Sequence, residues 1–137
     1  MNYDDHCIGV GRLWGNLQSL EATLRFFLTQ ANPSENYITK WASLRTLVNK
    51  YNGLLSAAEQ SLYSVDPSIV DIRNAMAHGR VSGQYPGEPF PLILSDDVIG
   101  EVDMTMEWFN DQQSLAQKQI DRISACGKER WQSPWWG

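Results

Sequence analysis

The chain has few of the residues on which metal and redox sites depend. Its 137 residues include two cysteines, Cys7 and Cys126, and two histidines, His6 and His78. These residues do not have the spacing of a zinc site, and no other cluster of His, Cys and Asp is spaced to bind a metal. There is also no glycine-rich phosphate-binding loop. We therefore expect no metal and no cofactor, and two free thiols rather than a disulfide.

Long apolar runs and an excess of positive charge are also missing. No stretch approaches the roughly 20 apolar residues that cross a bilayer, and the acidic N-terminus lacks the apolar core of a signal peptide. The formal net charge of −5 disfavours a broad nucleic-acid surface and binding to anionic membranes, although it leaves room for a local basic site. We expect a cytoplasmic protein without a membrane partner.

Hydrophobic residues make up 42% of the chain, which suits a single domain over residues 1–137 with its own core. From Ile8 to Gln30 they recur in alternating steps of four and three residues, which predicts one long helix. Three glycines near its start predict a late beginning or close packing there. The predicted apolar stripe consists of Leu13, Leu17, Leu20, Leu24 and Phe27.

Three shorter helices are expected before Gly79. The first covers Ile38 to Tyr51, and the second covers Leu54 to Tyr63. The third opens with Asp66 as its N-cap and Pro67 at its first position, and Gly79 suits its C-terminal cap. The residues expected to face inward in the first of these helices are Trp41, Leu44, Leu47, Val48 and Tyr51.

Residues 81–100 are rich in Gly and Pro, and they predict a short hairpin or ordered loop with extended pieces at Val81–Tyr85 and Phe90–Ser95. A last long helix is expected from Asp103, as its N-cap, to about Cys126, with Gly127 ending it. The predicted fold class is therefore all-α: an antiparallel bundle of four to five helices with a hairpin or loop before the last one.

The C-terminal tail, residues 128–137, contains Trp131, Trp135 and Trp136. Three tryptophans are costly to leave in water, so the tail either folds back on the core or forms a surface for a partner. The sequence leaves both alternatives open.

One segment, Ile72–Gly79, contains the side chains best suited to chemistry. Arg73, Asn74 and His78 lie near the end of a predicted helix. Five residues of an ideal helix rotate through about 500°, so Arg73 and His78 lie about 140° apart around the axis. They converge only if the helix ends near His78 and the arginine bends toward it. Asn74 is closer in azimuth and is placed to orient the imidazole.

The pattern Arg73-Asn74-x-x-x-His78, entered from Ile69-Val70-Asp71-Ile72 and left through Gly79, resembles the Arg-(four to six residues)-His motif of HEPN domains. These are compact all-α domains of prokaryotic toxins, antiviral systems and RNA-processing enzymes. The pattern Leu20-Glu21-x-x-Leu24-Arg25-x-Phe27-Leu28 is similar to the opening helix of that family.

The resemblance implies a metal-independent endoribonuclease that works as a homodimer, with two copies of the motif forming one composite site. It implies that His78 acts in acid-base catalysis, for which the ordinary histidine pKa of about 6.5 is suitable. It also implies that Arg73 stabilises charge on the phosphoryl group and that Asn74 positions His78 or the phosphate. From its position after the motif we add Arg80 as a local RNA contact. The expected partners are RNA, a second copy of the chain and an antitoxin or other protein, but not DNA.

Two alternatives stay open at the level of the sequence. One is a non-catalytic HEPN-like module that binds a protein or regulates transcription, as in the mannitol operon repressor family. It predicts that His78 is buried and hydrogen-bonded within its own chain, or that the two copies lie far apart. The other is an unrelated helical bundle with an accidental match. One toxin branch carries a modified Tyr where this chain has Arg80, so that mode of regulation is not expected.

Overall fold

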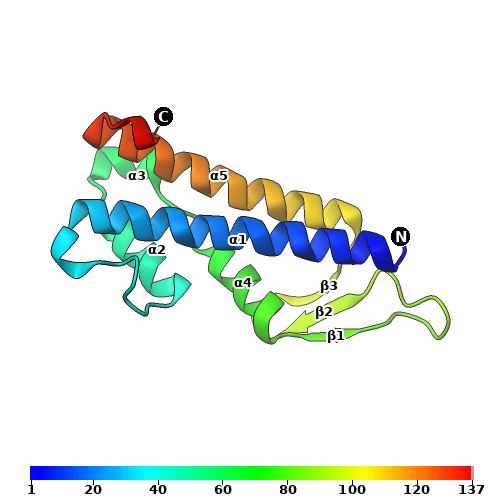
Figure 1. Cartoon of the computed structure of the whole chain (residues 1–137). Helices are drawn as coiled ribbons and strands as arrows, with labels where there is room; N and C mark the ends of the chain where they lie inside the picture. The colour runs from blue at the N-terminus through cyan, green and yellow to red at the C-terminus, as the bar shows by residue number, and fades with distance from the viewer. Residues whose placement is uncertain (137) are drawn as a thin grey trace. The chain divides into compact units, whose positions relative to one another are not determined.

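The computed structural model describes residues 1–136, without the side chain of Trp135, so Gly137 and that side chain lie outside the described part of the chain. Five α-helices and a small sheet account for most of the described residues (Figure 1). The helices are α1 (Tyr3–Ala31), α2 (Leu44–Gly53), α3 (Ala57–Tyr63), α4 (Ser68–His78) and α5 (Met106–Trp131). The strands are β1 (Arg80–Ser82), β2 (Ile93–Asp96) and β3 (Gly100–Asp103), and short 3-10 turns lie at η1 (Pro33–Glu35) and η2 (Pro134–Trp136).

The chain is mostly helical, as predicted, but it is not purely all-α. The three strands form one antiparallel sheet in the order β1-β2-β3. The third strand was not predicted, because Asp is a preferred N-cap residue and Asp103 was therefore expected to begin the last helix. The hydroxyl of Thr105 caps α5 instead, accepting a hydrogen bond from the Trp108 N–H at 3.0 Å. Asp103 pairs with Ile93 in the sheet.

The contacts of the chain divide it into two compact units. The first, unit 1, comprises residues 1–17 and 68–116, and the second, unit 2, comprises residues 18–67 and the chain from 117 onward. Their charges differ in sign. Unit 1 has ten acidic and three basic residues, a net charge of −7, whereas unit 2 has six acidic and eight basic residues, a net charge of +2. The overall −5 therefore conceals one acidic unit and one slightly basic unit.

In unit 1 the first half of α1 packs against the first half of α5. Gly9 lies directly against the ring of Phe109, and the Asn16 side chain donates to the Gln113 carbonyl at 3.3 Å. Both contacts advance along the two helices together, so these segments run in the same direction. The expected antiparallel arrangement is wrong for this pair. Of the two alternatives for the glycines of α1, close packing is confirmed at Gly9. The helix does not begin late: it starts at Tyr3, where Asn2 and Asp5 exchange side-chain-to-backbone hydrogen bonds.

In unit 2 the second part of the predicted leucine stripe of α1 forms the core with α2 and the end of α5. Leu20, Leu24 and Phe27 are completely buried, as are Leu47 and Tyr51. The tryptophan tail folds back, which was one of the two alternatives. Trp136 lies against Phe27, with ring centroids 5.8 Å apart, and its indole N–H donates to Gln30 at 2.6 Å. Trp131 packs on the same phenylalanine at 4.7 Å.

Three predicted helix boundaries in unit 2 are wrong. The helix expected from Leu54 begins at Ala57, because Ser56 caps it. Gly127 does not end α5, which continues to Trp131, because the absence of a side chain at Gly127 makes room for the Trp136 ring. The helix expected from Ile38 begins only at Leu44, with Ser43 as its N-cap. Trp41 was expected to face inward, but it is 87% exposed. None of the described helices combines the length and apolar character that a membrane crossing requires.

The close approach at Gly127 leads to a first prediction. A methyl group at this position would overlap the Trp136 ring, so Gly127→Ala should lower the free energy of unfolding by about 1 to 3 kcal/mol. Gly11→Ala is the matched control, because Gly11 is a helical glycine with open space around it. That control should stabilise by about 0.5 to 1 kcal/mol. Urea unfolding measures both, and equal effects of the two substitutions would contradict the packing role.

An ion pair in unit 2 leads to a second prediction. Glu59 caps α3 with Ser56 and pairs with Arg130 at 2.8 Å. The Arg130 hydrogen bond, followed by the Ser56 backbone N–H, lowers the pKa of Glu59 from its ordinary 4.5 to about 2. Its contribution to stability is therefore complete above about pH 4.5 and is lost as the pH falls toward 2.

Glu59→Gln should consequently destabilise the protein at neutral pH, and the difference from the unmodified chain should shrink as the pH approaches 2. Urea unfolding at several pH values is the measurement. Glu129→Gln is the control, since this exposed carboxylate makes no hydrogen bond or ion pair with the described residues. A difference for Glu59→Gln that does not change with pH would contradict the assignment.

Candidate functional site

Helix α4 positions the motif predicted from the sequence. It runs from Ser68 to His78, with Pro67 immediately before it. Ile69, Val70 and Ala75 form its buried face. This face fixes the helix on the rest of unit 1, and it leaves Arg73 and Asn74 partly exposed. The motif therefore lies on a regular helix whose rotation is set by packing.

His78 is the last residue of α4, and its side chain is exposed. Within the part of the chain that the structure describes, the imidazole has no hydrogen bond or ion pair. The non-catalytic alternative predicted a buried, hydrogen-bonded His78, and that form of it is contradicted. The imidazole is free to meet a ligand or a second copy of the chain.

Gly79 determines how the helix ends, but by a different mechanism from the one we predicted. It does not adopt the left-handed conformation of a C-terminal cap, since the glycines with positive φ are Gly87 and Gly100. A methyl group at Gly79 would instead lie 2.5 Å from the Ala75 carbonyl oxygen and 2.9 Å from Leu94 in β2. The glycine thus allows the end of α4 to contact β2 directly. This contact fixes the position of His78 relative to the sheet.

Arg73 is held by an aromatic side chain of α1. The carbon at the centre of its guanidinium lies 5.9 Å from the centroid of the Trp14 ring, within the range of a cation–π interaction. Trp14 was given no role from the sequence, because a tryptophan beside the leucine stripe reads as ordinary packing. The contact orients the arginine while leaving its five N–H donors available.

The structure does not join Arg73 to His78 within one chain. The helix stays regular through His78, so the separation of about 140° around the axis persists. The described side chains of Arg73, Asn74 and His78 make no hydrogen bond with one another. A single chain therefore presents one exposed imidazole and one guanidinium directed to Trp14, without a closed catalytic pair.

Arg80 follows at the start of β1, where it pairs with Ser95 across the sheet, and its side chain is exposed. The three basic residues of unit 1 are Arg12, Arg73 and Arg80, so two of the three belong to the motif or adjoin it. Positive charge in this acidic unit is thus concentrated near His78. Among the described residues no group of three or more His, Cys, Asp and Glu side chains is arranged to hold a metal.

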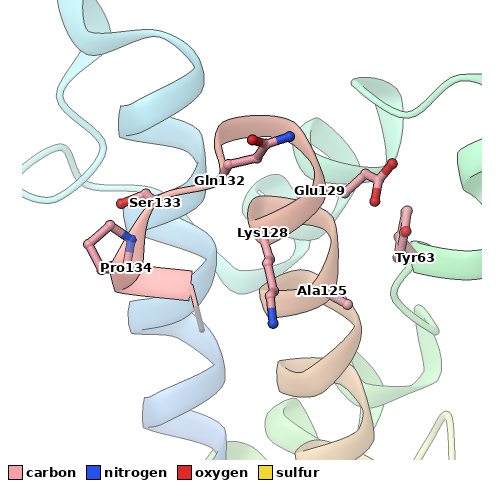
Figure 2. A pocket seen from close by; sticks show the side chains of 7 residues that line it. All are labelled: Tyr63, Ala125, Lys128, Glu129, Gln132, Ser133 and Pro134. Atoms are coloured by element: carbon pink, nitrogen blue, oxygen red, sulfur yellow. The ribbon is translucent and has the colours of Figure 1, made fainter.

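Unit 2 contains a hollow that is lined by no residue of the motif. It measures about 720 Å³ and is lined by Tyr63, Ala125, Lys128, Glu129, Gln132, Ser133 and Pro134. Figure 2 shows that the side chain of Lys128, on α5, and that of Gln132, just after α5, point away from each other. These polar groups do not converge on one point, so the hollow does not have the arrangement of a catalytic site.

Comparison with known proteins adds no relative: no family model, no curated protein and no solved structure matches the chain. The motif and its geometry therefore carry the functional argument.

The junction at Gly79 leads to a third prediction. Gly79→Ala should lower the free energy of unfolding by about 1 to 3 kcal/mol, because the added methyl group meets backbone atoms on both sides. Gly15→Ala is the control in the same unit, at a helical glycine with nothing near its missing side chain. Thermal or urea unfolding measures both. A stable Gly79→Ala protein would show that α4 and β2 do not need this close approach.

Proposed function

We propose that the chain is a metal-independent endoribonuclease whose active site is completed by a second copy of the chain. The observation that carries the proposal is the exposed imidazole of His78, which has no partner among the described residues and lies at the end of the helix that also presents Arg73. The resemblance to HEPN domains supports the same assignment. The toxin or defence role implied by that resemblance is part of the proposal.

The chemistry gives a reason for the second copy. Cleavage of RNA next to a 2′-hydroxyl needs one group that removes a proton from the nucleophile and one that gives a proton to the leaving oxygen. One chain supplies a single histidine at this site, since His6 has Phe90 and Phe109 as neighbours near the start of α1. Two chains supply two exposed imidazoles.

In the proposed reaction His78 of one copy takes the proton of the 2′-hydroxyl. The 2′-oxygen then attacks the adjacent phosphorus, and the bond from phosphorus to the 5′-oxygen breaks. The leaving oxygen takes a proton from the imidazolium form of the second copy's His78, so the products are a 2′,3′-cyclic phosphate and a free 5′-hydroxyl. Arg73 stabilises the charge on the phosphoryl oxygens with its planar set of donors. Asn74 positions the phosphate or the imidazole, and Arg80 adds positive charge.

A non-catalytic binding module is the second candidate. The net charge of −7 on unit 1 favours it, because an acidic surface repels RNA and suits a basic protein partner. In this form the two copies of the motif would lie far apart, and His78 would be a contact residue. An antitoxin would be one such partner of either candidate.

A cleavage assay distinguishes the two candidates. Its expected result is the fourth prediction. The purified protein should cleave single-stranded RNA in the presence of EDTA. His78→Ala should lower the rate by about 100-fold or more, and Arg73→Ala should do the same, because each removes a group acting in the transition state. Asn74→Ala should have a smaller effect. Arg12→Ala is the matched control, since it removes an exposed arginine of unit 1 outside the motif.

Analysis of the product ends and sedimentation velocity complete the experiment. A cyclic phosphate at the 3′ end and a dimer in solution agree with the proposal. Loss of cleavage in EDTA, unchanged cleavage by His78→Ala, or a strictly monomeric active protein would overturn it. A folded dimer without any cleavage would support the binding module.

A further inference from the structure

The segment between η1 and α2, residues 36–43, presents an unusual side chain to solvent. We call it the Trp41 loop. Trp41 is 87% exposed, the highest value among the described large hydrophobic side chains, and Ile38 in the same loop is also exposed. Large apolar side chains with so little cover carry a cost in water, and exposed aromatics are typical of binding surfaces.

The exposure of Trp41 does not come from a loosely held loop. The guanidinium of Arg25 in α1 donates to the carbonyl oxygens of Tyr37 at 2.7 Å, Lys40 at 2.6 Å and Ala42 at 3.0 Å. Tyr37 and Ala42 are themselves buried. Three bonds from one arginine thus fix the backbone on both sides of Trp41. The indole is displayed by a framework that is already ordered.

The surroundings of the loop are basic, although the chain is acidic. Residues 32–53 contain Lys40, Arg45 and Lys50 but only one acidic residue, Glu35, so this stretch has a net charge of +2. The ammonium groups of Lys40 and Lys50 lie 5.3 and 5.8 Å from the centroid of the Tyr37 ring. Lys40 also pairs with Glu35 at 2.7 Å. Two lysines are therefore gathered at the base of the Trp41 loop.

A small hollow adjoins these lysines. It measures about 220 Å³ and is lined by Leu28, Ala31, Asn32, Tyr37, Lys50 and Leu54. Its lining is mixed: Leu28, Ala31 and Leu54 are apolar, whereas Asn32, Tyr37 and Lys50 carry polar groups. Lys50 therefore borders both this hollow and the Tyr37 ring.

We propose that the Trp41 loop is a binding site for single-stranded RNA, in which a base stacks on Trp41 and the flanking phosphates meet Lys40 and Lys50. An exposed aromatic beside lysines is the combination that single-strand binding surfaces use. The assignment of RNA, among single-stranded nucleic acids, rests on the proposed nuclease function. Unit 1 provides little positive charge, so an anchor in the basic unit 2 supplies electrostatic attraction that unit 1 lacks.

Binding is measured on the full chain carrying His78→Ala, in EDTA, so that the probe stays intact. The probe is a fluorescently labelled uridine oligomer of about 12 nucleotides, followed by anisotropy. Adding Trp41→Ala should weaken binding by about 5- to 150-fold, which is the range for loss of one stacked base. Trp41→Phe should retain most of the affinity, because it keeps an aromatic face.

Two matched controls separate the loop from general effects. Tyr85→Ala removes another exposed aromatic, in acidic unit 1, and should leave the affinity unchanged. Lys50→Ala should reduce the dependence of log affinity on log salt by about 0.7, the value for one phosphate contact with a single strand. Lys118→Ala removes an exposed lysine of the same unit and should not change this slope.

The outcomes keep this inference distinct from the nuclease proposal. Binding that depends on Trp41 in a protein that never cleaves RNA would support the loop and overturn the nuclease. Cleavage-competent protein whose Trp41→Ala variant binds the oligomer as tightly as its parent would overturn the loop alone. If Trp41→Ala instead changes the sedimentation of the protein and not its RNA binding, the loop is a protein contact and the proposal is wrong. Equal losses with Tyr85→Ala would also overturn it.

Discussion

Steric contact at glycines determines much of this structure. Gly9 receives the ring of Phe109, Gly127 receives Trp136, and Gly79 allows the end of α4 to meet β2. At each position a side chain would separate two elements that now touch. Because protein interiors are close-packed, such separations cannot be absorbed by small shifts elsewhere. The direction of α1 relative to α5 in unit 1, the folded-back tail and the place of His78 all depend on these contacts.

The sequence predicted those features that follow from local periodicity. The leucine stripe of α1 and the position of His78 at the end of a helix were both correct. Features created by distant partners were missed. The loop before α2 is held by Arg25, which donates to carbonyls more than ten residues away, and Trp41 lies outside any helix. A glycine read as a helix cap proved to be a place of close approach, because sequence alone does not show what lies opposite it.

The candidate site was predicted in part. Arg73, Asn74 and His78 occupy one regular helix, as expected, but the role of Trp14 in holding Arg73 had no recognisable signal. The charge asymmetry was also hidden, because each unit is assembled from two separate stretches of the chain. A running count of charge along the sequence mixes the two units. Only the fold shows that the motif contributes much of the positive charge in its own surroundings.

The two units are each built from two separate stretches of the chain, which affects the order in which they can fold during synthesis. Residues 18–67 emerge from the ribosome long before the stretch after residue 117 that completes their core, and residues 1–17 emerge before the rest of unit 1. The helices α1 and α2 of unit 2 must therefore wait for the end of α5 before their shared core is closed. Since each unit includes part of α5, neither unit can complete its core before that last helix has been made.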